Sequence, residues 1–150
     1  MAVDRVWGDK VNQTSRGDDD TQTQNKNRQT VILDTNGLLM LFQFHINLES
    51  ELDRLLGLYN IVIPSVVINE LSKLSSSVPE AKAALKLAQK YNVLQVEERN
   101  NMATIDDVIL DQAHILNAMV VTNDKELRKK LKQKGLTSIY LRAKSYLKMD

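Results

Sequence analysis

Short apolar strands alternate with amphipathic helical stretches from about residue 30 to the end of the chain. The expected strands share runs of branched apolar residues and lie near 30–34, 60–63, 93–96, 119–122 and 138–141. Apolar residues at helical spacing fill the segments between them, near 36–44, 48–59, 65–75, 79–91, 104–117 and 124–134, and a short terminal helix is expected near 143–148. Strands separated by helices of about 10–15 residues are typical of βαβ units. The pattern therefore predicts an α/β fold with three α/β/α layers around a central, mainly parallel sheet of about five strands.

The first 29 residues differ from the rest because they offer almost nothing apolar to bury. Asp18-Asp19-Asp20 leads into a polar run from Thr21 to Asn27. Such a composition does not offset the entropy that ordering would cost. We therefore expect a flexible polar arm at residues 1–29, which could recruit a protein partner, followed by one folded domain at residues 30–150. The aspartate run could attract metal ions, but a solvated charge run is the commoner meaning of such a sequence.

Composition narrows the classes of function. The chain has 150 residues, a formal net charge of +1 and no cysteine, which excludes disulfides, thiolate catalysis and cysteine-ligated zinc. Its two histidines, His45 and His114, do not favour a histidine-rich metal site, and we assign both to structural positions. No run approaches the ~20 apolar residues of a membrane span, and the N-terminus lacks the apolar core of a secretory signal. We expect a cytoplasmic protein that does not enter a membrane, and any affinity for RNA must come from a local patch.

Two aspartates occupy equivalent places in two strand-to-helix turns. Asp34 follows the apolar run Val31–Leu33, and Asp124 closely follows the apolar run Met119–Val121. The carboxyl ends of parallel strands form one edge of a sheet, where ligand crevices lie, so we expect the two carboxylates to meet there. Two close carboxylates repel each other unless a cation or a shared proton lies between them, and a hard divalent metal is the natural partner.

Helix capping is the alternative role of both aspartates, because Asp and Asn are favoured at the position that opens a helix. The neighbouring polar residues could cap these helices instead. They are Thr35 and Asn36 in the first turn, and Thr122 and Asn123 in the second. In that case both acids would be free to face the crevice.

Glu70 is a further acid that the pattern directs towards the interior. Ser65 is expected to cap a helix whose buried stripe consists of Val67, Leu71 and Leu74. Glu70 lies on the edge of that stripe, and a carboxylate aimed at the interior needs a partner. A salt bridge to a lysine such as Lys73, or a side chain that extends to solvent, would explain its position as well as a metal ion would.

An adjacent acidic pair completes the acidic set. Asp106 borders the buried stripe of the helix near 104–117, whereas Asp107 turns to the opposite side. Thr104 with Asp107 three residues later also resembles a capping box. Asp106 is therefore the expected metal ligand. Asp107 stays an alternative, because the geometry near the start of a helix is loose.

A basic run begins directly beside Asp124. Residues 125–134 hold six basic residues and one acid, which is enough charge for a phosphate-binding face. We expect contacts with RNA from Lys125, Arg128, Lys129 and Lys132. The alternative is that the helix dipole and solvent favour lysines in the second half of a helix.

Together these motifs resemble the PIN domain, a family of Mg²⁺- or Mn²⁺-dependent nucleases that mostly cleave RNA. The resemblance covers residues 30–141, and its motifs are Val31–Asn36, Pro64–Leu71, Asp106–Leu110 and Thr122–Asp124. The resemblance implies that one or two metal ions are held by Asp34, Glu70, Asp106 and Asp124, with Asp107 as the alternative third ligand. It also implies that the carboxylates or their waters are oriented by Thr35, Asn36, Thr122 and Asn123.

The same resemblance bears on the biological role. The paired aspartates, the Thr122–Asp124 turn and its continuation Lys125–Lys129 look most similar to archaeal relatives of ribosomal-RNA-processing PIN nucleases. Toxins of toxin–antitoxin modules are the close alternative, although such toxins usually lack a polar arm of 29 residues. A non-catalytic RNA-binding assembly factor is a third hypothesis, but every acidic position is filled. PIN domains often dimerise, and a homodimer would extend the RNA groove.

Overall fold

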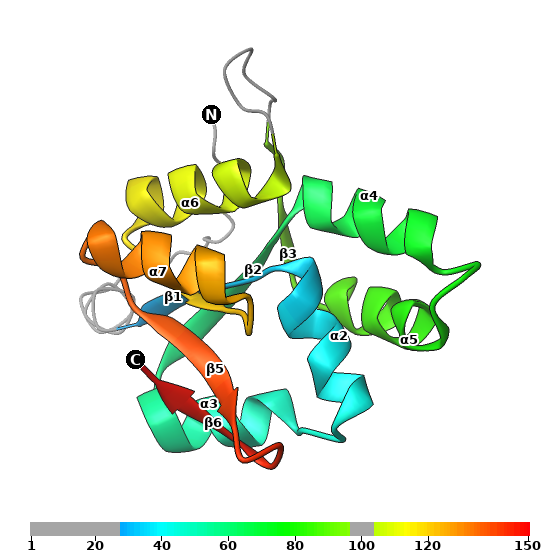
Figure 1. Cartoon of the computed structure of the whole chain (residues 1–150), viewed down its shortest axis with the longest axis horizontal. Coiled ribbons are helices and arrows are strands. Elements are labelled where there is room, and N and C mark those ends of the chain that lie inside the picture. Colours follow the sequence, from blue (N-terminus) through cyan, green and yellow to red (C-terminus); the bar gives the residue numbers. More distant parts are fainter. Residues whose placement is uncertain (1–27, 97–103) are drawn as a thin grey trace, which may run out of the picture.

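The computed structural model describes residues 28–96 and 104–150. Within them the strands form one six-stranded sheet in the order β3-β2-β1-β4-β5-β6 (Figure 1). The strands are β1 (Gln29–Leu33), β2 (Tyr59–Pro64), β3 (Asn92–Leu94), β4 (Met119–Val121), β5 (Ser138–Arg142) and β6 (Tyr146–Met149). The helices are α2 (Thr35–Gln43), α3 (Leu48–Leu56), α4 (Ser65–Leu74), α5 (Pro79–Ala88), α6 (Ile105–Leu116) and α7 (Lys125–Gln133). The predicted α/β fold with a mainly parallel sheet is confirmed.

The predicted polar arm lies almost wholly outside the described residues, as do Asp18–Asp20. The exceptions are Arg28 and Gln29. Gln29 opens β1 and pairs with Tyr59, so the folded domain begins slightly earlier than the predicted boundary.

The chain order of the strands reverses next to β1. From β1 the chain moves outward through β2 to β3, and it then returns to β4 on the other side of β1; all these pairings are parallel. Such a reversal opens a crevice at the carboxyl ends of the strands. The register aligns Leu33 of β1 with Val121 of β4, so the two strands end at the same level. The turns that follow them therefore start side by side.

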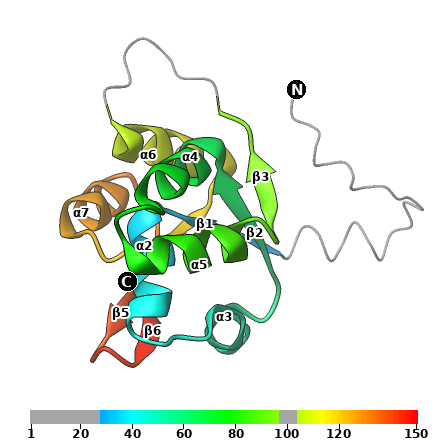
Figure 2. The same ribbon diagram turned by 90° about the vertical axis from the view of Figure 1, so that its right-hand side faces the viewer.

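Helices cover the sheet in two groups. Helices α6 and α7 contact each other, and they also contact β1 and β5 respectively, while α2, α4 and α5 contact one another. Figure 1 shows α6 and α7 together on the left of the view and α2 and α5 on the right; Figure 2 shows the second pair from its own side. Because both faces of the central strands are covered, residues such as Val31, Ile32 and Val120 are completely buried.

Ser65 does not cap α4 as the sequence suggested. The residue before the helix is Pro64, and no side chain caps this end of α4. The hydroxyl of Ser65 instead accepts the backbone N–H of Val96 at 3.1 Å, which ties the segment after β3 to the start of α4. Of the predicted stripe, Val67 and Leu71 are fully buried, as expected.

The terminal helix predicted near 143–148 is wrong, because this segment forms β6, antiparallel to β5. The two strands are joined by a tight turn in which the N–H of Ser145 bonds to the carbonyl of Arg142 at 3.1 Å. Both central residues, Ala143 and Lys144, have positive φ angles of 56° and 57°. Such turns normally show Asn or Gly at these places. The usual hairpin signal is therefore missing from the sequence.

The outer edge of β6 is closed by side chains of α3. The N–H of Leu147 donates to Glu51 Oε1 at 2.8 Å, and its carbonyl accepts from Arg54 at 2.7 Å. The two side chains also pair with each other at 2.8 Å. They therefore take the place of a neighbouring strand at this position of an edge that would otherwise expose backbone hydrogen-bonding groups.

Candidate active site

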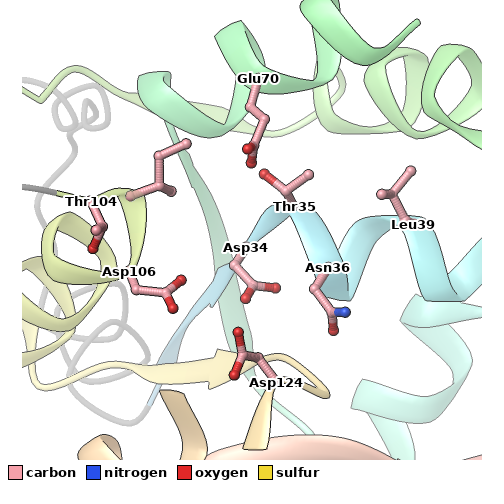
Figure 3. Close-up of a pocket in the computed structure, with 9 residues that line it drawn as sticks. Asp34, Thr35, Asn36, Leu39, Glu70, Thr104, Asp106 and Asp124 are labelled. Carbon is pink, nitrogen blue, oxygen red and sulfur yellow. The ribbon is translucent and has the colours of Figure 1, made fainter. Parts of the chain in front are cut away.

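A cavity of about 460 Å³ lies at the carboxyl ends of β1 and β4 (Figure 3). Its acidic lining comes from separate elements and consists of Asp34, Glu70, Asp106 and Asp124. The remaining lining residues are Thr35, Asn36, Leu39, Thr104 and Ile105. In Figure 3 the carboxylates of Asp34, Asp106 and Asp124 point towards one another. The fold thus brings together the acids that the sequence singled out, although 90 positions separate the first from the last.

Asp34 is the most buried of the four, with 4% of its surface exposed. Its Oδ1 accepts the N–H of Gly37, and its carboxylate also accepts a hydrogen bond from the hydroxyl of Thr122. Burial raises the pKa of Asp34 to about 7, against the two hydrogen bonds that lower it, and the charges of Asp106 and Asp124 raise it further. An ionised Asp34 therefore needs a positive partner inside the cavity.

Gly37 allows the turn after β1 to press against the end of β4. A Cβ atom at this position would lie 2.1 Å from the carbonyl oxygen of Val121 and 3.1 Å from Asp34 Oδ1. No side chain fits in that space. The sequence reasoning did not single out Gly37, although a glycine in the first turn of a helix costs helix stability and so indicates a packing reason.

Asp124 closes the opposite side of the cavity and opens α7. Its Oδ1 accepts the backbone N–H groups of Glu126 and Leu127 at 2.9 and 3.2 Å. Its own N–H donates to the hydroxyl oxygen of Thr122 at 3.1 Å. Since the Thr122 hydroxyl also donates to Asp34, this one buried side chain links the two acidic turns.

Two asparagines fix the relative position of these turns. Asn36 Oδ1 accepts the N–H of Asn123 at 2.7 Å, across 87 positions of sequence. Asn123 Oδ1 in turn accepts the N–H of Leu141 on β5 at 3.0 Å. Helix α2, the turn after β4 and strand β5 are thereby held as one unit. Neither asparagine caps a helix, because Asp34 and Asp124 do so themselves.

The adjacent acids at the start of α6 have different positions. Asp106 lines the cavity, whereas the backbone N–H of Asp107 bonds to the hydroxyl of Thr104, which caps the helix. Burial raises the pKa of Asp106, and the charges of Asp124, Asp107 and Glu70 add to that effect, while Lys130 opposes it. Lys130 is a basic residue near the acids that the sequence reasoning left out. Only the packing of α7 against α6 reveals it.

Glu70 reaches the cavity from α4, and in Figure 3 its carboxylate points towards Thr35. None of the ion pairs among the described residues joins Glu70 to Lys73, so the alternative of a simple salt bridge fails. The buried hydroxyl of Thr35 lacks a hydrogen-bond partner within this part of the chain. Glu70 thus faces a space that a water or a hydrated cation would fill, whereas the hydroxyl oxygen of Thr35 is enclosed by protein atoms.

A family model described as a PIN like domain matches residues 31–144. The chain belongs to this family. The protein is 33% identical to ribonuclease VapC4 of Methanocaldococcus jannaschii over 126 residues, which cover 79% of this chain and 95% of the relative. It is 29% identical to ribonuclease VapC9 of Archaeoglobus fulgidus over 124 residues, covering 79% and 87%.

Among solved structures, the PIN domain endonuclease Utp24 superposes with a TM-score of 0.71, covering 83% of this chain and 92% of that one. The sequence identity of 23% makes this a likeness of fold. The two sequence relatives and the structural neighbour cover similar shares of the chain, 79% and 83%.

The basic helix α7 of this PIN domain offers fewer free cations than the sequence suggested. Lys125, Lys129 and Lys132 are exposed. Arg128 instead stacks over the ring of Tyr140, 3.7 Å from its centroid, and lies 3.6 Å from a carboxylate oxygen of Asp150. The structure therefore gives Arg128 a packing role, and three of the four expected RNA contacts stay available.

The acidic lining of the PIN domain fits a hard divalent cation by its chemistry. All of its charged donors are carboxylate oxygens, the ligand type that Mg²⁺ prefers. Burial of Asp34, with its pKa of about 7, calls for a positively charged group when this carboxylate is ionised. No three acidic or histidine side chains of the described residues are close enough to form a ready-made metal-binding group. Three of the acids would therefore have to move closer together to ligate one ion directly.

The described part of the PIN domain also contains no helix with the length and apolar character that crossing a membrane requires.

Proposed function

We propose that this PIN-domain protein is a metal-dependent endoribonuclease that hydrolyses RNA phosphodiester bonds in the acidic cavity. The observation that carries this proposal is the convergence of Asp34, Glu70, Asp106 and Asp124 on one cavity at the carboxyl edge of the sheet. The names of the two sequence relatives, both ribonucleases, support the same class of reaction.

The four acids would hold one or two Mg²⁺ or Mn²⁺ ions through carboxylate oxygens and waters. When bound, such an ion supplies an activated water as the nucleophile and stabilises charge on the leaving oxygen. Asp34 is the ligand we expect to matter most, because Gly37 and Thr122 hold its carboxylate in one orientation. Asp107 is a weaker candidate than Asp106, since it is not among the residues that line the cavity.

Polar neighbours would keep these carboxylates in place. Thr122 bonds both acidic turns, and Asn36 and Asn123 hold the turns to each other and to β5. We assign them the task of keeping the ligands at a fixed separation as the charge in the cavity changes. Thr35, which lines the cavity beside Asp34, would help to orient a carboxylate or a water.

The substrate would be drawn to the site by exposed lysines of α7. Lys125 is the first residue of this helix, directly after Asp124, and Lys129 and Lys132 follow along it. They supply contacts to the phosphate backbone, which give affinity without sequence specificity. Arg128 would contribute less than these three, because its guanidinium is engaged by Tyr140 and Asp150.

The proposal is tested by titrating Mg²⁺ and Mn²⁺ into the protein with labelled single-stranded and hairpin RNAs, and with a circular RNA that only an endonuclease can open. Asp34→Asn and Asp124→Asn should abolish cleavage while remaining folded. Lys86→Ala on the surface of α5 serves as a control with unchanged activity. Tight RNA binding without any metal-dependent cleavage would reject catalysis and favour the alternative of a non-catalytic RNA-binding assembly factor.

Two biological roles fit such an activity. One is ribosomal-RNA processing, and the other is that of a toxin-type ribonuclease of a toxin–antitoxin module. Sequencing the RNA ends produced in cells that express the active protein or its Asp34→Asn variant separates them. Ends confined to ribosomal-RNA precursors support processing, whereas growth arrest with cleavage of other RNAs supports the toxin role.

The assembly and location of the protein are separate proposals. Formation of a homodimer, recruitment of a protein partner through residues 1–29 and residence in the cytoplasm each follow from the sequence reasoning alone. Light scattering of the full chain tests the homodimer, and affinity capture from cell extract with the full chain beside a chain that starts at Arg28 tests recruitment through residues 1–29.

A further inference from the structure

A second, smaller cavity continues the acidic one between α4 and the start of α6. It has a volume of about 180 Å³ and is lined by Val66, Asn69, Glu70, Lys73 and Ile105. Glu70 and Ile105 line both cavities, so the two are neighbours. In Figure 1 the start of α4 lies next to the start of α6. We call this smaller cavity the α4–α6 groove.

The lining of the groove divides into an apolar floor and a polar rim. Val66 is 8% exposed and Ile105 is half-buried, and these two supply the apolar surface. Asn69 and Lys73 are exposed on the side of α4 that faces the groove. A volume of 180 Å³ equals that of roughly six water molecules in the liquid. Such a space suits a single small group and is too small for a duplex.

Lys73 is the basic residue that lines the groove, and its ammonium group has no acidic partner among the described residues. Neither of the ion pairs between described residues involves it. It follows Glu70 by three positions, a rise of about 4.5 Å along the helix. Both side chains line the groove, so the acidic site and this ammonium group lie about one helical turn apart along α4. A chain whose reacting phosphate lies at the acids would place a neighbouring phosphate near Lys73.

We propose that the α4–α6 groove binds the nucleotide next to the scissile phosphate, with Lys73 contacting its phosphate, Val66 and Ile105 packing against its base, and Asn69 bonding to the base edge. This inference rests on the proposed endoribonuclease function. The amide of Asn69 carries both donors and an acceptor, so it discriminates between bases that present different edges. No aromatic side chain lines the groove, so base preference there comes from Asn69 and not from ring stacking. The substrate is thereby single-stranded at this position.

The test pairs substitutions in the protein with single neutral linkages in the RNA. A short single-stranded RNA with one mapped cleavage site is prepared with a methylphosphonate in place of one phosphate, on either side of the scissile one. Cleavage and binding are measured for the wild type, Lys73→Ala, Lys73→Arg and the control Lys86→Ala, which removes an exposed lysine of α5 that lines neither cavity.

Lys73→Ala should lower kcat/KM about 10-fold, mainly through KM, and reduce the salt slope of binding by about 1. One of the two neutral linkages should cause a similar loss in the wild type and no further loss in Lys73→Ala. Lys73→Arg should retain most of the activity because the charge is kept. Lys86→Ala should behave as the wild type. In Asn69→Ala, any base preference at the neighbouring position should disappear.

The inference is overturned if Lys73→Ala stays within about twofold of the wild type, since one phosphate contact is expected to be worth more. Additive losses from Lys73→Ala and each neutral linkage would also overturn it, because independent effects mean no contact. Base preference that survives in Asn69→Ala removes Asn69 from the subsite. Failure of the proposed function looks different: the wild type then cleaves nothing, while the binding measurements still report on Lys73.

Discussion

Replacing Asp34 with asparagine should stabilise the metal-free protein at alkaline pH, although it removes the principal metal ligand. Asp34 is 4% exposed, and its pKa of about 7 lies about three pH units above the ordinary value of 3.8. Each unit corresponds to about 1.4 kcal/mol, so ionisation of Asp34 costs the folded state about 4 kcal/mol relative to the unfolded state.

The sign follows from proton binding. Between about pH 4 and pH 7 the folded chain holds a proton on Asp34 that the unfolded chain has released. The contribution of Asp34 to stability is therefore fully present below pH 4, declines across this window and is lost above pH 7. Asparagine has no such dependence. It also keeps an oxygen that accepts the N–H of Gly37, and asparagine caps helices as well as aspartate does.

Urea unfolding with a chelator, at several values from pH 4 to pH 8.5, measures the difference between Asp34→Asn and the wild type. We expect a difference near zero at pH 4 that grows to between about 2 and 4 kcal/mol in favour of the variant at pH 8.5. Asp107→Asn, outside the cavity, should stay within about 0.5 kcal/mol of the wild type at every pH. With Mn²⁺ at about 100 times its dissociation constant, the wild type should gain about 2.7 kcal/mol and the variant little. A variant no more stable than the wild type at pH 8.5, or equally stabilised at pH 4, would refute the reasoning.

Three further substitutions test other parts of the site. Gly37→Ala should cost about 3 kcal/mol or more in urea unfolding and lower cleavage, because its Cβ meets a backbone carbonyl at 2.1 Å. Asp106→Asn should lower metal-dependent cleavage on the order of 100-fold, whereas Asp107→Asn should change it only several-fold; equal losses would contradict the separation of their positions. Arg128→Ala should cost about 1 kcal/mol of stability through its lost ring contact, and it should weaken RNA binding less than Lys129→Ala does, as a filter-binding titration can measure.

The arrangement of the sheet was accessible from the sequence because its strands are buried on both faces and separated by helices. Apolar runs such as Val31–Leu33 predict where β1 ends, and the polar residues of the site follow directly after it. The last strand was not accessible. Its turn contains Ala143 and Lys144 at positions where glycine or asparagine would have indicated a hairpin. Its edge is closed by side chains of α3, which lie 90 or more positions away in the sequence. Neither feature can be recognised from the residues of the strand itself.

In the site, too, some residues could be predicted from local sequence patterns and others could not. The acids could be placed because each follows a strand or borders a helical stripe, which fixes its direction within the fold. Lys130 could not be found in this way, since its effect on Asp106 depends on how α7 packs against α6. Packing of helix against helix is set by side chains from both, and no periodicity within one helix reports it.

Helix capping and metal binding were weighed as alternatives for Asp34 and Asp124, and the structure makes them compatible. Each acid caps its own helix through Oδ1, which leaves Oδ2 of Asp124 without a capping bond and open to the cavity. The capping bonds fix the side-chain rotamer of Asp124, so its second oxygen is oriented before a cation binds. Such preorganisation favours ligand binding. It follows that alanine is the wrong probe of these ligands. Asp34→Ala or Asp124→Ala would remove a cap worth about 1 kcal/mol together with the ligand, whereas asparagine keeps the cap and removes the charge. If the asparagine and alanine variants lose cleavage equally but each alanine variant is less stable than its asparagine counterpart, the two roles are separable on one side chain.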